Sequence, residues 1–331
     1  MAAPFHLERL LFTPATPSNQ ATPVIFAFPN EYSIGITSLG YQIIWAMLVQ
    51  RSDLDVARWF TDGHEPLPSR VELLGVSISW ELDYANILTM LESLDVPILT
   101  CDRGNEHPLI FGGGPVLTAN PEPFAAFFDV VLLGDGEVVL DAFIDAYQTV
   151  RDGDRTTQLR RLAQVPGVYI PALYEPTYVS PTGPLASIQP VDADIPPLIE
   201  KQTYRGNTLS TSSVVTEKAA WENIYMVEVV RSCPEMCRFC LASYLTLPFR
   251  AASVTDSLIP SVEKGLAVTN RLGLLGASVT QHPAFDDLLE YLNQAQFDDV
   301  RLSLSSVRTN TVNEKLTSTL TRHGAKSITI A

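Results

Sequence analysis

The motif Arg231-Ser-Cys-Pro-Glu-Met-Cys-Arg-Phe-Cys-Leu241 holds three of the four cysteines of this chain, Cys233, Cys237 and Cys240. Their C-x3-C-x2-C spacing places three thiols on one short loop, where they can ligate a single soft metal centre. The apolar run at residues 225–230 predicts a strand directly before the loop. Three protein ligands leave one position of a four-coordinate centre open, as a catalytic site requires and a closed structural site does not.

The composition predicts a compact α/β protein. The chain has 331 residues, enough for two domains, and 46% of them are hydrophobic while 18% are charged. The net charge is −15 and no run of Lys or Arg exceeds two residues, so we expect no extended nucleic-acid surface. No apolar stretch reaches membrane-spanning length and the start lacks a secretory pattern, so we expect a cytoplasmic location and no membrane contact.

Cysteine usage fits that location. Thiols stay reduced in the cytoplasm, so three clustered cysteines indicate metal or redox chemistry rather than disulfides. Cys101 stands apart from the motif, and we expect it to be a half-buried structural thiol.

Strands alternate with helices over the first 150 residues, which predicts a doubly wound parallel sheet of the Rossmann type. Ligands bind such sheets at the carboxyl ends of the strands. Glycine turns follow three of the expected strands, and both ligand approach and a tight turn without a ligand explain them. The expected strands are residues 24–28, 56–60, 73–79, 109–111 and 130–133, the helices are 39–49 (with Ser38 as N-cap), 86–94 and 138–150, and the turns carry Gly35, Gly112–Gly114 and Gly134–Gly136.

Prolines and a Ser/Thr-rich run interrupt the pattern after residue 165. We interpret residues 166–221 as a linker, with one short hairpin around residues 168–170. The predicted organisation is therefore a first domain at residues 1–165, the linker, and a second domain at residues 222–331.

The last section alternates again, with a repeat of about 28 residues that matches the βα units of a barrel. It holds only about four strands and the sequence stops inside the last one. We therefore expect an incomplete (β/α) barrel, either a piece of a longer protein or a part that needs a partner. The expected strands are residues 272–278, 300–305 and 327–330, besides the one before the cysteines, and the helices are 254–269, 285–295 and 312–321.

The cysteine motif resembles the hallmark of the radical S-adenosylmethionine (radical SAM) superfamily, in which an aromatic residue, here Phe239, precedes the last cysteine. The N-terminal section resembles the cobalamin (B12)-binding-like domain that precedes the barrel in one subgroup, a poorly characterised two-domain family. The stretches that carry this second resemblance are residues 28–35, 79–86, 112–115, 120–123 and 134–137.

The resemblance implies that the three cysteines hold a [4Fe-4S] cluster. Its open iron would bind S-adenosylmethionine, and reduction by a donor such as flavodoxin or ferredoxin would yield a 5′-deoxyadenosyl radical. It further implies that Phe239 lies near the adenine, Gly276 near the methionine amino group, and Ser305 and Arg308 near the ribose and carboxylate. The chain departs from the common Gly-Gly-Glu run, since residues 275–278 read Leu-Gly-Ala-Ser.

The same resemblance implies a cobalamin site formed by Tyr32, Gly35, Ser77, Gly112, Gly113 and Gly114. Histidine-on cobalamin sites carry D-x-H-x-x-G, whereas residues 30–35 read Asn-Glu-Tyr-Ser-Ile-Gly, and tyrosine is a poor cobalt ligand. His64 offers an isolated D-x-H, but after the wrong strand and without the glycine. Cobalamin without a protein ligand and a vestigial domain that shapes the substrate cleft both remain open.

Two functions follow. The first is a radical SAM enzyme with an unknown small-molecule substrate, performing methyl or methylthio transfer. The alternative is a non-catalytic Fe–S or zinc-binding module, with His282 or His323 as fourth zinc ligand. We expect Glu228, in the strand before the cysteines, to pair with Arg231 rather than to act as a base.

Overall fold

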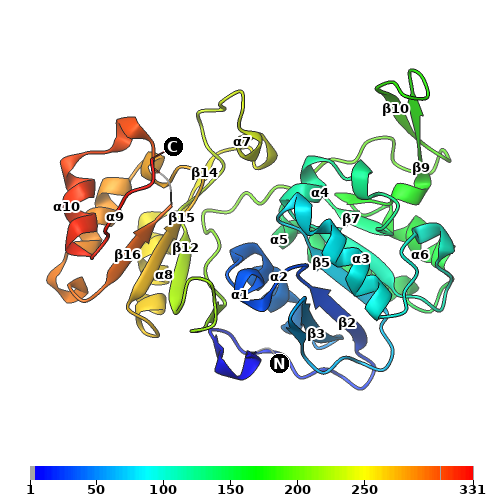
Figure 1. Cartoon of the computed structure of the whole chain (residues 1–331), viewed down its shortest axis with the longest axis horizontal. Coiled ribbons are helices and arrows are strands. Elements are labelled where there is room, and N and C mark those ends of the chain that lie inside the picture. The colour runs from blue at the N-terminus through cyan, green and yellow to red at the C-terminus, as the bar shows by residue number, and fades with distance from the viewer. Residues whose placement is uncertain (1–3, 306, 331) are drawn as a thin grey trace. The chain divides into compact units, whose positions relative to one another are not determined.

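The computed structural model describes residues 4–305 and 307–330 and comprises two compact units (Figure 1). Among these residues, unit 1 consists of Pro14–Gly35 and Met47–Tyr204. Unit 2 consists of Pro4–Thr13, Ile36–Ala46 and the chain from Arg205 onward. The division into residues 1–165, 166–221 and 222–331 stays a prediction. Each compact unit combines segments that lie far apart in the sequence, so no single position of the chain separates the two units.

Unit 1 contains a sheet with strand order β4-β3-β2-β5-β6-β7-β8. The five middle strands run parallel and the two edge strands antiparallel to their neighbours. Because β3 and β5 lie on opposite sides of β2, the strand order reverses beside β2, as at the ligand-binding switch point of doubly wound sheets. The strands are β2 (Thr22–Ala27), β3 (Leu54–Phe60), β4 (Gly63–His64), β5 (Leu73–Ser77), β6 (Leu109–Gly113), β7 (Val130–Leu132) and β8 (Val168–Tyr169).

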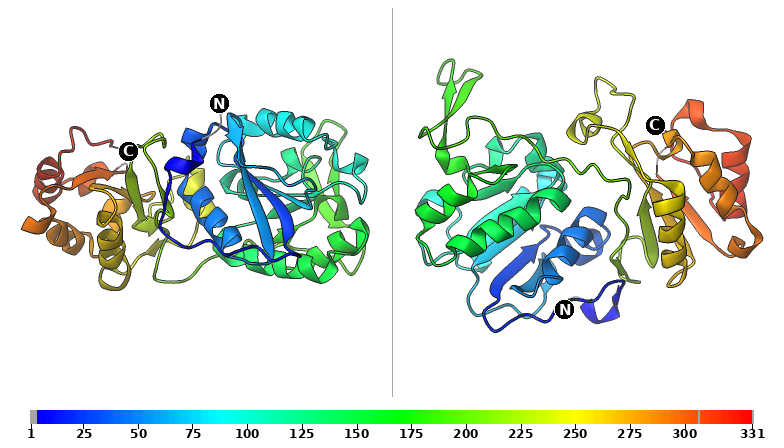
Figure 2. Two further views of the ribbon diagram at one scale, coloured as in Figure 1. Left: turned by 90° about the horizontal axis from the view of Figure 1, so that it is seen from below. Right: turned by 180° about the vertical axis from the view of Figure 1, so that it is seen from behind.

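Helices cover both faces of this sheet, which confirms the predicted doubly wound α/β architecture. Helix α3 lies toward the viewer in Figure 1, and α5 lies toward the viewer in the view from behind in Figure 2. Strands covered on both faces are mainly apolar, and Val24 and Ile25 of β2 are both fully buried. The helices of this part are α1 (Tyr32–Gly35), α3 (Tyr84–Ser93), α4 (Pro115–Ala119), α5 (Gly136–Val150) and α6 (Arg155–Leu162).

Helix α2 (Leu39–Val49) has the predicted bounds, and Ser38 caps it by accepting a hydrogen bond from the Tyr41 N–H (3.4 Å). Its residues up to Ala46 belong to unit 2. There the Gln42 Oε1 accepts hydrogen bonds from the N–H groups of Ser213 (2.8 Å) and Val214 (3.0 Å). A polar side chain of an early helix thus satisfies backbone donors far along the chain.

The proline-rich section contains more regular structure than the sequence predicted. The short hairpin expected around residues 168–170 was wrong, because β8 pairs with β7 instead. A hairpin follows later, formed by β9 (Tyr174–Tyr178) and β10 (Leu185–Pro190). Pro176 and Pro190 lie inside these strands, which a two-stranded sheet tolerates because each strand has an edge without ladder partners.

Unit 2 is built on a three-stranded parallel sheet of order β12-β15-β16, and it also has two short antiparallel pairs, β1 with β11 and β13 with β14. The 210–216 segment covers the outer edge of β12 through backbone hydrogen bonds, including Ser212 N–H to Met226 O (2.9 Å). The strands are β1 (Arg9–Leu10), β11 (Val214–Val215), β12 (Ile224–Glu228), β13 (Val230–Arg231), β14 (Arg250–Ala251), β15 (Arg271–Leu275) and β16 (Arg301–Leu304).

The expected βα repeat is present in unit 2, where helices follow β15 and β16. The predicted strand at residues 327–330 was wrong in extent: in the described part of the chain it is reduced to one parallel bridge between Ile330 and Val307. The helix predicted from residue 254 begins with a π-helical turn (Val254–Leu258). The helices are α7 (Leu241–Leu245), α8 (Ile259–Leu266), α9 (Phe285–Leu292) and α10 (Glu314–Arg322).

Candidate metal centre

The cysteine loop, residues 232–240, leaves β13 and enters α7, with Cys240 as the N-cap residue of that helix. Two loop residues have left-handed backbone conformations, Ser232 (φ +70°) and Met236 (φ +46°), which turn the chain back on itself. Helix α7 holds the turn. The Tyr244 hydroxyl donates to the Met236 carbonyl (2.7 Å), and the Ser232 hydroxyl donates to the Ser243 carbonyl (3.0 Å).

All three motif cysteines are free thiols in the structure, and so is Cys101, for which the predicted half-buried environment was wrong because it is exposed. Cys233 is 9% exposed, and Cys237 and Cys240 are half-buried. Hydrogen bonding from the Ser243 hydroxyl, helped by backbone N–H groups, lowers the pKa of the Cys240 thiol. Lowering that pKa favours the thiolate, the form that binds metal.

The donor set of the loop consists of three cysteine sulfurs. In the described residues, no group of three or more His, Cys, Asp and Glu side chains is placed to hold one metal ion. In a [4Fe-4S] cluster, each cysteine ligates a different iron. Three thiols on one loop, with sulfur as their only donor atom, match that chemistry.

Neither histidine considered as a fourth zinc ligand has a ring nitrogen available. The His282 Nε2 contacts the Ala252 carbonyl (2.6 Å), and its Nδ1 accepts from the Ala284 N–H (3.1 Å). The two ring nitrogens of His323 face the carbonyls of Val300 and Leu292, each at 3.0 Å. Both rings therefore hold backbone groups, and the structure gives the zinc alternative no support.

The loop is tied to the ends of both following strands through Glu235. Its Oε1 accepts a hydrogen bond from Gln281 Nε2 (2.5 Å), and its Oε2 lies 3.4 Å from Arg308 NH2. Gln281 follows β15 and Arg308 follows β16. Sequence reasoning missed Glu235 and Gln281, although the position of Glu235 inside the motif was a usable signal.

The residues expected to bind S-adenosylmethionine occupy different environments. The Ser305 hydroxyl donates to the Gly276 carbonyl (2.8 Å), so these two lie together at the carboxyl ends of β16 and β15. The Arg308 Nε is buried and has no hydrogen-bond partner among the described residues. Phe239 is 92% exposed. Their roles toward the cofactor stay predictions, and Arg308 has spare donor capacity for a carboxylate.

The expected Glu228–Arg231 pair is confirmed. The guanidinium donates two hydrogen bonds to the carboxylate, from Nε to Oε1 (2.8 Å) and from NH2 to Oε2 (2.7 Å). A bidentate pair directly before the cysteine loop fixes the path by which the chain enters it.

In unit 1, the residues expected to bind cobalamin have packing roles. Tyr32 is 1% exposed, its ring stacks edge-on against Phe60 (centroids 5.2 Å apart), and its N–H donates to Asp62 (2.7 Å). Its ring therefore lies in the core of unit 1 and does not point outward as an axial ligand would. His64, the other candidate, contacts the Glu65 carbonyl through Nδ1 (2.7 Å).

The glycines that were expected to bind cobalamin also have packing roles. A Cβ on Gly35 would lie 2.5 Å from the Phe60 ring, and one on Gly112 would lie 2.6 Å from Leu117 and Phe128 side chains. Gly114 has φ +112° and its Cβ would lie 2.4 Å from the Ile78 carbonyl oxygen, so this turn requires glycine. Ser77 and Gly113 pair in the ladder between β5 and β6. Cofactor binding by these residues stays a prediction.

Polar side chains meet at the switch point of the unit 1 sheet, which sequence reasoning did not identify. The Asn30 amide after β2 donates to Asp83 Oδ1 (2.9 Å) after β5, and the Asn86 amide donates to the Pro29 carbonyl (2.8 Å). Asp83 is 6% exposed, and this burial raises the pKa of its carboxyl. Trp80, 59% exposed, precedes it.

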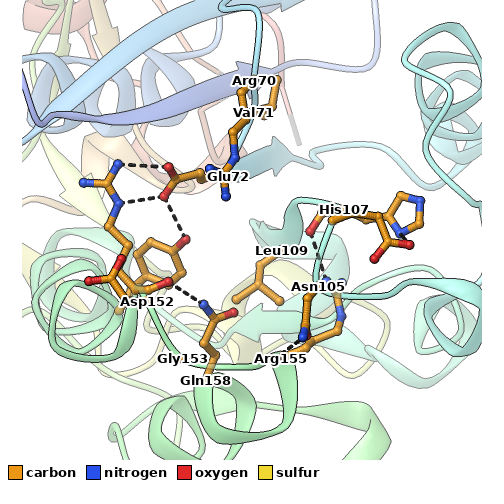
Figure 3. A pocket seen from close by; sticks show the side chains of 13 residues that line it. Arg70, Val71, Glu72, Asn105, His107, Leu109, Asp152, Gly153, Arg155 and Gln158 are labelled. Atoms are coloured by element: carbon orange, nitrogen blue, oxygen red, sulfur yellow. Dashed lines mark hydrogen bonds and ion pairs between the residues drawn. The ribbon is translucent and has the colours of Figure 1, made fainter.

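A polar cavity of about 400 Å³ lies at the opposite, amino-terminal end of this sheet (Figure 3). Two of its arginines are already bound, and Arg151 forms a bidentate pair with Glu72 (2.7 and 2.9 Å). Arg155 donates to the carbonyls of Gly104 and His107 (3.1 and 3.2 Å). The cavity is therefore a structural feature of unit 1, remote along the strands from the ends where such sheets bind ligands.

Comparisons with known proteins agree with this architecture. Residues 59–171 match the family model "Radical SAM proteins, N-terminal". The uncharacterised protein MJ0966 of Methanocaldococcus jannaschii is 25% identical over 313 residues, which cover 93% of this chain and 60% of that protein. The chain thus spans less than two thirds of the length of this curated relative.

Two solved structures share the fold. The radical S-adenosylmethionine methyltransferase TsrM from Kitasatospora setae, with cobalamin and a [4Fe-4S] cluster bound, has a TM-score of 0.56 and 14% identity over 92% of this chain and 59% of its own. The cobalamin-dependent enzyme OxsB, with aqua-cobalamin and S-adenosylmethionine bound, has a TM-score of 0.52 and 14% identity over 93% of this chain and 43% of its own. The predicted resemblance to radical SAM proteins with a cobalamin-binding-like domain is confirmed.

Proposed function

We propose that this chain is a radical SAM enzyme that holds a [4Fe-4S] cluster on Cys233, Cys237 and Cys240 and binds S-adenosylmethionine beside it. The observation that carries the proposal is the loop itself, which holds three free thiols after the first parallel strand of a βα repeat. When bound and reduced, the cluster would supply the electron that cleaves the sulfonium bond and releases a 5′-deoxyadenosyl radical.

The residues of the chain would position these groups. Cys233 would hold the cluster on its buried side, and the half-buried Cys237 and Cys240 on the outer side. Arg308 would bind the cofactor's carboxylate with its Nε, which has no partner among the described residues, and Gly276 would lie near the methionine amino group. An external one-electron donor such as flavodoxin or ferredoxin would reduce the cluster.

The substrate is proposed to be a small molecule, and the reaction methyl or methylthio transfer. The fold shared with a cobalamin-bound methyltransferase supports methyl transfer with cobalamin as second cofactor. Cobalamin would bind without a protein ligand to cobalt, because Tyr32 lies buried in the core. A cytoplasmic location belongs to the same proposal, since free clustered thiols persist in a reducing compartment.

The test is anaerobic reconstitution of the full chain with iron and sulfide. We expect about four irons per chain, and release of 5′-deoxyadenosine when dithionite and S-adenosylmethionine are added. Stoichiometric zinc without iron would refute the proposal in favour of a zinc-binding module. A separate absorbance titration with hydroxocobalamin decides whether cobalamin binds.

A further inference from the structure

Gln281 connects two points of the cysteine loop. It ends the 3-10 turn Val279–Gln281 after β15. Its Oε1 lies 3.7 Å from the Cys233 Sγ, which donates to it as a thiol, and also accepts from the Ser278 hydroxyl. Its Nε2 donates to Glu235. One amide therefore contacts both the most buried cysteine of the motif and the carboxylate two residues further along.

This arrangement suits the thiol but does not suit an iron-bound thiolate. A ligating sulfur carries no proton, so it accepts hydrogen bonds and no longer donates them. An amide oxygen facing that sulfur would be repelled by it. The amide of Gln281 presents an NH2 group when turned over, and the sulfur would then receive a donor.

Turning the amide over removes the hydrogen bond from Gln281 to Glu235, and Arg308, which follows β16, can replace it. Arg308 NH2 already lies 3.4 Å from Glu235, so it can pair with this carboxylate while the Nε is left for the cofactor. The guanidinium therefore has donor capacity to take over the carboxylate. With a cluster bound, Glu235 and the Cys233 sulfur both require a hydrogen bond from the Gln281 amide. Arg308 can pair with Glu235 and leave the amide to the sulfur.

We propose that Gln281 is a positioning residue that donates a hydrogen bond to the Cys233 sulfur once a cluster is bound, and thereby raises the reduction potential of the cluster. The inference rests on the proposed function, since it presumes that the motif holds a [4Fe-4S] cluster. Hydrogen bonds to ligand sulfurs stabilise the added electron, whereas a nearby carboxylate disfavours it. Gln281 and Glu235 should therefore affect the potential in opposite directions.

The test is an EPR-monitored redox titration of the anaerobically reconstituted chain, with iron counted for each sample. Gln281→Leu should lower the reduction equilibrium constant about tenfold, equivalent to about 59 mV for a one-electron couple. Glu235→Gln should raise the potential. The matched control is Gln296→Leu, the same substitution at an exposed position of unit 2, which should leave the potential unchanged.

The outcomes separate this inference from the proposed function. If the wild-type chain takes up no iron, the proposed function fails. If Gln281→Leu holds wild-type iron at an unchanged or higher potential, the inference is overturned. If that variant loses iron, Gln281→Met, which is closer in shape and has no amide, decides in its place. Loss of iron from both would assign Gln281 to loop structure and also overturn the inference.

Discussion

The amino-terminal cavity of unit 1 and the cysteine loop of unit 2 both gather arginines and carboxylates, but they differ in how these groups are satisfied. In the cavity, every N–H-bearing nitrogen of Arg151 donates to Glu72 or to a backbone carbonyl. At the loop, the Arg308 Nε has no partner among the described residues, and three thiols are free. Arg151 of the cavity is thus fully paired, whereas the loop retains unused donors and thiols.

This difference separates stabilising networks from functional ones. A buried polar group without a partner costs stability, and a bound ligand is one way in which such a group can be satisfied. The cavity lies at the end of the unit 1 sheet opposite to the one at which doubly wound sheets bind ligands. The variants below test whether each network has the role that its hydrogen bonding indicates.

The largest effect should follow from Cys237→Ala at the loop. Loss of one of three ligands should reduce reconstituted iron from about four per chain to nearly none. Iron and sulfide analysis after anaerobic reconstitution measures this. The control is Cys101→Ala, at the exposed thiol outside the motif, which should bind as much iron as the wild type. Wild-type iron in Cys237→Ala would show that the ligands are assigned wrongly.

Asp129→Asn should be the most destabilising change in the unit 1 network. Asp129 Oδ2 accepts from Arg103 (3.1 Å) and Arg155 (2.7 Å), and the Arg103 side chain is 0% exposed. Neutralising the carboxylate leaves a buried guanidinium without its counter-charge, at a cost of about 3–5 kcal/mol. Urea unfolding followed by hydrogen exchange of unit 1 peptides measures the loss.

The matched change is Asp141→Asn, since Asp141 is 58% exposed and pairs with Arg51 at the surface. It should alter the free energy of unfolding by about 0.5 kcal/mol or less. Equal effects of the two substitutions would contradict a buried structural role for Asp129.

Gly276→Ala and Gly113→Ala compare the strand ends of the two units. A Cβ on Gly276 would lie 2.6 Å from the Val230 carbonyl oxygen at φ +155°, so we expect unit 2 to lose about 1–3 kcal/mol. A Cβ on Gly113 would find only ordinary contacts of 3.7 and 3.8 Å, so that change should stay within about 0.5 kcal/mol. Hydrogen exchange resolved by unit distinguishes the two, and a larger loss from Gly113→Ala would refute this geometry.

The smallest effect concerns pH. Burial alone would raise the pKa of the Glu72 carboxyl, but the hydrogen bonds and charge of Arg151 outweigh it and hold that pKa below its ordinary value of 4.5. The pair therefore stabilises the fold above about pH 4.5, and the contribution disappears as pH falls through the lowered pKa.

Glu72→Gln should thus cost at most about 1 kcal/mol near neutral pH, and the difference from wild type should vanish in acid. Unfolding curves at several pH values between about 2 and 7 measure it. A difference that grows in acid would have the wrong sign for a carboxyl with a lowered pKa.

Local sequence pattern predicted most of the fold. Helix α2 was found to the residue because its apolar spacing is uninterrupted and Ser38 caps it. The parallel strands were found because burial on both faces leaves continuous apolar runs. The β9–β10 hairpin was missed because Pro176 and Pro190 resemble strand breakers, and an edge position that tolerates proline is a property of pairing, which the sequence does not display.

The sequence predicted the candidate site only where its residues lie close together in the chain. Cys233, Cys237 and Cys240 share one loop, so their spacing revealed them. Gln281 and Glu235 meet across about 46 residues through two different strand ends, and no local pattern joins them. The packing roles of Gly35 and Gly112 were equally invisible, because the rings they touch come from other strands and loops.

The pairing of β1 with β11 has a consequence for synthesis of the chain. Arg9 pairs with Val215, so the first strand of unit 2 leaves the ribosome about 200 residues ahead of its partner. At about 5–20 residues per second, that interval lasts roughly 10–40 s. All of unit 1 emerges in that interval, so its sheet can close before the cysteine loop has been translated. The strand at Arg9–Leu10 therefore remains without its β11 partner for most of the synthesis of the chain.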